Sequence, residues 1–169
     1  MASKLSTSRL FWLGALFLFS CFAKADVPRF ENYKVEEVFK GKHHDAVASE
    51  ENKNWAEGRK KAIKQPVNFA GHYVVYANGC GGGSICGEIL DVKTGQVVTS
   101  FPNAYYIIGN DGTAPYAAVY KPDSKLLEIM GVAADPEVDV EGNDLEEGNR
   151  QRFYEFDGKK LTLIELVDQ

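Results

Sequence analysis

The chain has 169 residues with 19 Lys and Arg, 24 Asp and Glu, and a formal net charge of −5. This acidity argues against nucleic acid as a partner, because nucleic-acid binding requires basic surfaces that neutralise phosphates. It is compatible with simple solubility or with attraction to a basic protein.

The first residues, 1–25, have the pattern of a secretory signal. Lys4 and Arg9 give a basic start, an apolar run follows over 10–22, and Ala-Lys-Ala at 23–25 offers a cleavage site. The apolar run is shorter than the roughly 20 residues of a membrane-spanning helix. We therefore predict export.

The part of the chain that follows the predicted signal, 26–169, has 144 residues. It contains 16 Lys and Arg against 24 Asp and Glu, which gives a formal charge of −8. Its length predicts a single β-rich domain. Attachment to a membrane is expected only if Cys21, at the end of the apolar run, is lipidated as in a lipoprotein.

In chain order, residues 26–42 have weak strand character and predict an extended segment or an edge strand. Residues 49–64 predict one helix, since Ser49 can cap its N-terminus and Pro66 ends it. Glutamates near the start and lysines near the end agree with the helix dipole. The narrow apolar stripe built on Trp55 predicts a helix that buries one side against a sheet.

From residue 68 onward the apolar pattern changes to the period of 2 that is typical of strands. Residues 69–77 are apolar on both faces and predict a central strand. Further strands are expected over 85–92, 96–101, 103–108, 116–120, 125–132, 150–156 and 160–166. The sequence therefore predicts an α+β fold: a predominantly antiparallel β meander of seven or eight strands, as a curled sheet or partly open barrel, with one N-terminal helix packed on it.

Two cysteines, Cys80 and Cys86, remain after removal of the signal. An even number in an oxidising compartment predicts a disulfide, and the Cys-x5-Cys spacing differs from redox and zinc motifs. The loop between them, Gly81-Gly82-Gly83-Ser84, can bind an anion through free amides or can be a clamped turn. No P-loop lysine follows it, and the next expected element is a strand.

The histidine that precedes this loop, His72, is a candidate binding residue. With Ser84 or Asp91 it can also form the base and partner of a hydrolytic site, provided that the side chains meet. Ser84 lacks the pattern of a nucleophile elbow, so a histidine bonded to backbone is the alternative.

The acidic segment 135–147 allows a calcium interpretation. Its residues at loop positions 1, 3, 5, 7 and 12 are Asp135, Glu137, Asp139, Glu141 and Glu146. Val140 replaces the glycine that the sharp turn of such a loop requires. A solvated acidic loop and a docking surface for a basic partner are the alternatives, and no motif predicts another metal or a cofactor.

Several of these residues together resemble a group of small exported bacterial proteins. The shared features are NFAGHY at 68–73, GCG at 79–81 with the second cysteine, LDVKTGQV at 90–97, PDSKLL at 122–127 and YEFDGKKL at 154–161. The resemblance implies bacterial export and a common fold, and it implies no activity.

We predict a periplasmic or secreted bacterial binding protein that docks another protein, such as an inhibitor or an immunity protein. This expectation depends on the exported small domain, the acidic charge and the glycine-disulfide loop. The alternatives are a small hydrolase that uses His72 with Ser84 or Asp91, and an envelope protein with a ligand-binding or structural role.

Overall fold

The computed structural model describes residues 27–48, 55–109, 112 and 114–169. The predicted signal and the proposed Ser49 cap lie outside these residues. The described elements, in chain order, are η1 (Phe30–Tyr33), α1 (Ala56–Ala62), β1 (Tyr73–Gly81), β2 (Ser84–Asp91), β3 (Val97–Ser100), β4 (Tyr105–Tyr106), β5 (Ala117–Tyr120), β6 (Leu126–Val132), β7 (Glu137–Val138), β8 (Asp144–Leu145), β9 (Asn149–Phe156) and β10 (Leu161–Asp168).

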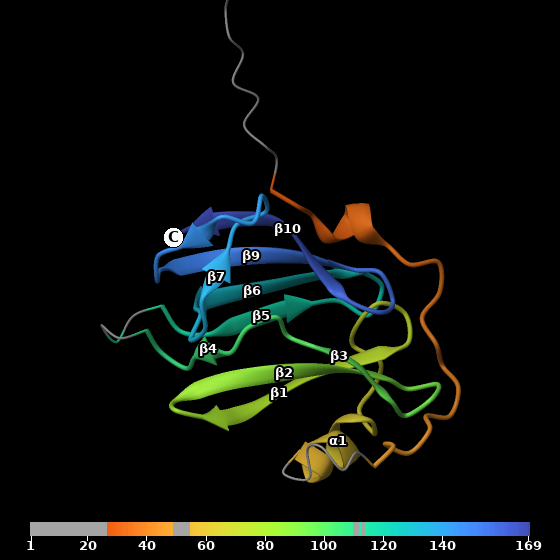
Figure 1. Cartoon of the computed structure of the whole chain (residues 1–169). Helices are drawn as coiled ribbons and strands as arrows, with labels where there is room; N and C mark the ends of the chain where they lie inside the picture. The colour runs from red at the N-terminus through yellow and green to blue at the C-terminus, as the bar shows by residue number, and fades with distance from the viewer. Residues whose placement is uncertain (1–26, 49–54, 110–111, 113) are drawn as a thin grey trace, which may run out of the picture.

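The strands form two four-stranded antiparallel sheets and a small β7–β8 hairpin. The first sheet has the order β1-β2-β3, with β4 also paired to β2, and the second has the order β10-β9-β6-β5. Figure 1 shows the second sheet above the first and α1 beneath β1. The predicted antiparallel fold with one helix is confirmed.

The two sheets meet at a seam beside β4. Tyr105 forms an isolated bridge with Ala133, and the N–H of Tyr116 donates to the carbonyl of Ile107 at 3.1 Å. The described strands nevertheless remain two sheets and do not close into a barrel.

The predicted number of seven or eight strands is wrong, because the acidic segment adds β7 and β8. The Asp139 carboxylate closes their turn by accepting the backbone N–H groups of Glu141 at 2.9 Å and Asn143 at 2.8 Å. The sequence pattern did not reveal these strands because each has only two residues.

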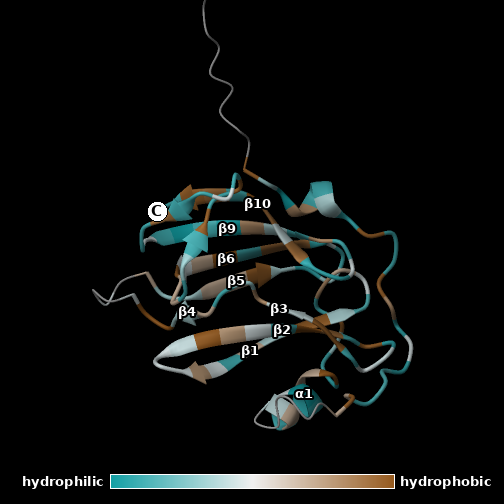
Figure 2. Cartoon of the chain, in the orientation of Figure 1, coloured by the Kyte–Doolittle hydropathy of each residue, from teal (hydrophilic) through white to brown (hydrophobic). Residues whose placement is uncertain are grey.

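The main core lies between the two sheets. It is built from aromatic and branched side chains that both sheets contribute: Phe69, Tyr73, Val75, Ile89, Phe101, Tyr105, Leu127, Ile129, Tyr154 and Phe156. A second cluster joins the first sheet to α1 through Ala62, Ile63, Val67, Val74, Leu90 and Val92. Figure 2 shows the hydrophobic residues along β2, β5 and β6 and hydrophilic residues in the loops between strands. The sandwich is therefore stabilised mainly by apolar burial.

The prediction of a central strand over 69–77 is wrong, because β1 begins at Tyr73 and pairs with β2 alone. Tyr73 and Val75 are buried in the main core while Val74 is buried under α1. Apolar residues on both faces of a strand therefore indicate that both faces are covered. They do not indicate that the strand has a neighbouring strand on each side.

Candidate functional site

The tip of the β1–β2 hairpin carries the glycine-disulfide loop. Cys80 and Cys86 form the predicted disulfide, and Gly81 pairs with Ser84 across the turn. Gly82 and Gly83 have φ of +59° and +76°, as in a type I′ turn, which favours glycine at both central positions. A Cβ atom at either glycine would meet nothing within 4 Å, so backbone conformation, and not space, requires glycine here.

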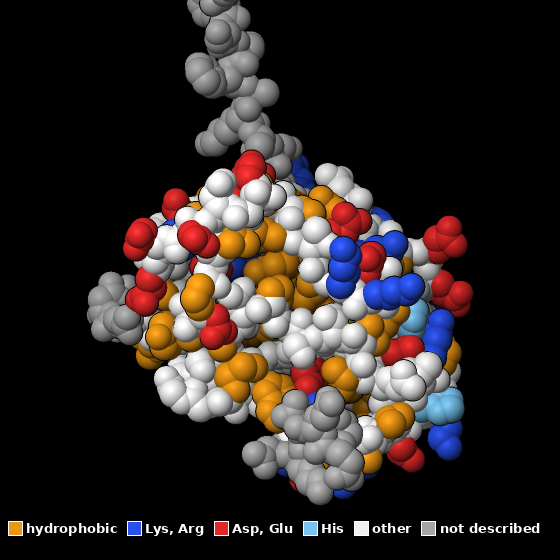
Figure 3. All heavy atoms as spheres, in the orientation of Figure 1, with side chains coloured by type: hydrophobic (Ala, Val, Ile, Leu, Met, Phe, Trp, Pro, Cys, Tyr) orange, Lys and Arg blue, Asp and Glu red, His pale blue; other side chains and the backbone are white. Residues whose placement is uncertain are grey.

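The tip is held on its β4 side. Ser84 pairs with Tyr106, and the N–H of Ile107 donates to the carbonyl of Gly83 at 2.9 Å. Ile107 and Ile108 are 50% and 54% exposed. Figure 3 shows hydrophobic side chains over the β4 end of the molecule. A fixed, bare backbone turn therefore lies beside two exposed isoleucines.

His72 lies at the opposite end of the same hairpin. The β1–β2 register runs from Tyr73 opposite Asp91 to Gly81 opposite Ser84, so the structure does not bring His72 and Ser84 together. His72 Nε2 is 3.9 Å from Asp91 Oδ1, which is beyond hydrogen-bond distance.

The Asp91 carboxylate is engaged in the turn that follows β2. It accepts the N–H of Lys93 at 2.8 Å and the hydroxyl of Thr94 at 3.1 Å. Burial lowers the pKa of His72, the charge of Lys93 lowers it further, and Asp91 opposes both. His72 is therefore mainly neutral at pH 7, and Asp91 acts first as a turn residue.

The turn before His72 explains part of the NFAGHY pattern. Ala70 and Gly71 have φ of +41° and +86°. A Cβ atom at Gly71 would lie 2.8 Å from the carbonyl oxygen of Glu37, so the close approach of this segment also requires glycine. A cavity of about 270 Å³ opens beside His72 and Tyr73. Ala70 and Gly71 therefore have a structural role, which is to form the turn that leads into β1.

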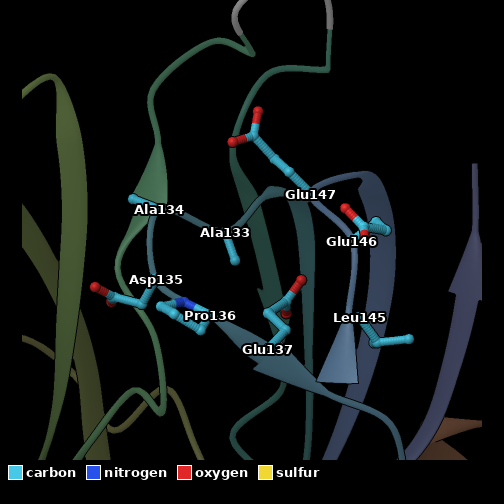
Figure 4. Close-up of a pocket in the computed structure, with 8 residues that line it drawn as sticks. All are labelled: Ala133, Ala134, Asp135, Pro136, Glu137, Leu145, Glu146 and Glu147. Carbon is cyan, nitrogen blue, oxygen red and sulfur yellow. The ribbon is translucent and has the colours of Figure 1, made fainter. Parts of the chain in front are cut away.

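The five carboxylates of the calcium interpretation are not gathered. Among the described residues, no group of three or more His, Cys, Asp or Glu is arranged to hold a metal ion. Figure 4 shows the carboxylates of Asp135, Glu137 and Glu146 pointing in different directions around a cavity of about 330 Å³.

Glu137 instead pairs with a buried arginine that the sequence analysis missed. Arg152 is fully buried and donates to both oxygens of Glu137, with Nη2 to Oε2 at 2.6 Å. Its Nη1 donates to the carbonyls of Gly131 and Arg150 at 2.9 and 2.8 Å. Its guanidinium also lies 5.2 Å from the ring centroid of Tyr105. The acidic segment is thus pinned to the second sheet.

The charge state of this pair follows from its contacts. Burial alone would lower the pKa of Arg152, but the hydrogen bonds and charge of Glu137 outweigh burial and raise it. One feature of the sequence indicated this pair. Arg152 alternates with Tyr154 and Phe156 and therefore shares their inward face, and a buried arginine requires an acidic partner.

A second buried ion pair lies under α1. Arg59 donates to Glu88 through Nε at 2.8 Å and Nη2 at 2.6 Å, and the Tyr76 hydroxyl donates to the same carboxylate. Glu88 lines a cavity of about 530 Å³ together with Trp55 and the disulfide. The pair joins the helix to the first sheet immediately behind the glycine loop.

Comparison with protein-family models, with curated proteins and with solved structures gives no match. No helix among the described residues is long and apolar enough to cross a membrane.

Proposed function

We propose that the chain is an exported, non-enzymatic binding protein that docks another protein on the tip of the β1–β2 hairpin. One observation carries the proposal: a backbone turn that is closed by a disulfide and bonded to Ile107 lies beside the exposed side chains of Ile107 and Ile108. Exposed apolar side chains beside a fixed backbone are typical of protein-docking surfaces.

The compartment and the partner follow from the same features. The predicted signal and the disulfide support a periplasmic or secreted bacterial protein. The formal charge of −8 on residues 26–169 supports a basic partner, and a role as an inhibitor or immunity protein requires only such a docking surface.

The hydrolase alternative has less support. Its Ser84 lies at the far end of the hairpin from His72, and its Asp91 is already bonded to the following turn. No observation favours it over docking.

The test is affinity capture from a periplasmic extract with the natural chain and with a double variant, Ile107→Ser with Ile108→Ser. The matched control is Val138→Ser with Val140→Ser, because these valines are 48% and 50% exposed on the acidic segment. We expect the tip variant to lose at least about 90% of the captured partner and the control to retain it. With the immobilised chain well below the Kd, this loss corresponds to about a tenfold loss of affinity. Capture of no partner in mild salt, or equal capture by both variants, would overturn the proposal.

A further inference from the structure

β1 is an edge strand whose first half is closed by an asparagine. The Asn68 side chain donates from Nδ2 to the Val75 carbonyl at 3.0 Å, and its Oδ1 accepts the Val75 N–H at 2.8 Å. Phe69 satisfies the N–H and carbonyl of Tyr73 on the same side. The Asn68 amide therefore takes the place of a neighbouring strand at Val75.

The second half of the same edge is open. In an antiparallel strand, alternate residues direct both backbone groups toward the same side, so Ala77 and Gly79 face the side that Tyr73 and Val75 face. No described residue pairs with Ala77 or Gly79 there. Both residues are exposed, and a bulge at Cys80 ends the regular edge. Two N–H groups and two carbonyls are left facing outward.

Both edges of the second sheet carry features that discourage strand pairing. β5 has four residues, with Pro115 just before it and Lys121 and Pro122 after it. β10 carries Glu165 and Asp168 and has a bulge. Short strands, prolines, charges and bulges protect natural edges. The segment from Ala77 to Gly79 has none of these within it, and the whole β1–β2 hairpin lacks Lys and Arg.

We propose that an extended, basic segment of a partner protein adds to β1 as a further strand across Ala77 to Gly79. This inference rests on the proposed function and specifies its mode. Only an extended backbone presents alternating N–H and carbonyl groups at the spacing of this edge. Glu88 is neutralised by Arg59 and Asp91 is bonded in the following turn, so it is the whole chain, with its formal net charge of −5, that attracts a positive segment.

A second copy of this chain is a poorer occupant of the edge. Two copies paired through Ala77 and Gly79 would bury little more than these small residues, whereas stable dimers bury at least about 1,200 Å². Two chains of the same net charge also repel each other.

The test uses a phage-displayed library of random dodecapeptides selected on the immobilised full chain. Ala77→Pro removes the outward N–H and leaves the β1–β2 ladder donors in place. Ala77→Thr is the matched control, because it retains the N–H. We expect the selected peptides to be rich in Lys and Arg. Ala77→Pro should weaken their binding at least about tenfold, and Ala77→Thr should change it less than about threefold.

Circular dichroism verifies the fold of each variant. If Ala77→Pro does not fold, Ala77→Lys serves in its place, because a lysine at the edge repels a basic strand while the N–H remains. We further expect bound peptide to slow amide exchange at Ala77 and Gly79.

Selection of no peptide, equal binding by Ala77→Pro, or a dimer through this edge in analytical ultracentrifugation would overturn strand addition. Binding that survives Ala77→Pro but is lost in the Ile107→Ser, Ile108→Ser variant would overturn strand addition and leave docking at the tip intact. Peptides that are insensitive to both changes would overturn both proposals.

Discussion

Replacing Glu137 with glutamine removes the charge that neutralises a fully buried arginine. The side chains of Glu137 and Arg152 are 8% and 0% exposed, so water does not replace the lost carboxylate. Breaking a buried ion pair by removing one partner costs about 3–5 kcal/mol. Glutamine has nearly the same shape, which makes loss of charge the main change.

This loss is large compared with the total free energy of unfolding, which is about 5–15 kcal/mol for a typical domain. It corresponds to a fall in Tm of about 10 °C for a chain of this size. Urea unfolding followed by circular dichroism measures it, with Asp144→Asn as the control, because Asp144 is an exposed acid on β8 of the same segment. We expect the control to stay within about 0.5 kcal/mol of the natural chain.

A double variant, Glu137→Leu with Arg152→Met, tests the reasoning further. Apolar replacement of both partners should recover much of the stability that the single change loses. Arg152 is then no longer a buried charge, and Arg150, which also contacts Glu137 at 3.4 Å, keeps its ion pair with Asp168 at 2.8 Å. A loss below about 1 kcal/mol for Glu137→Gln would refute the conclusion that this pair pins the acidic segment.

Three other predictions follow from the β1–β2 hairpin and the segment that precedes it. Replacing Cys80 and Cys86 together with serine should lower the free energy of unfolding by about 2 kcal/mol, measured in urea, because the disulfide closes a short loop; no change would show that the turn is already constrained without it. Asn68→Ala should cost about 1–3 kcal/mol and speed amide exchange at Val75, whose outward groups lose their partner; unchanged exchange at Val75 would contradict the assigned role. Because the folded pKa of His72 is lowered, the unfolded chain binds more protons, so stability should fall as pH drops from about 6.5 toward that lowered pKa. His72→Asn should reduce this slope in unfolding measurements across pH, and an unchanged slope would assign it to another group.

The strands that the sequence predicted well are those with local signals. Asp157-Gly158 joins β9 and β10, and the turn at Pro122 joins β5 and β6, as the turn chemistry indicates. The disulfide also followed from counting cysteines. Such features depend on a few neighbouring residues, and therefore the sequence suffices to predict them.

The missed features depend on polar side-chain contacts. β7 and β8 are held by Arg152 and Asp139, and neither contact appears in the alternation of apolar residues. The outward backbone groups of Val75 are satisfied by the Asn68 side chain, and the sequence pattern does not distinguish Asn68 from any other polar residue. The separation of His72 from Ser84 could have been predicted from the sequence, because a turn at Gly82 and Gly83 sets the register of the hairpin and places the two residues at opposite ends.

The Asn68 amide also bears on self-assembly. Cross-β stacking needs exposed segments of about six or seven residues with strong strand propensity. By closing the edge at Val75, Asn68 leaves only the short run up to the bulge at Cys80. The folded chain therefore presents an open edge that is too short to template growth of a fibril.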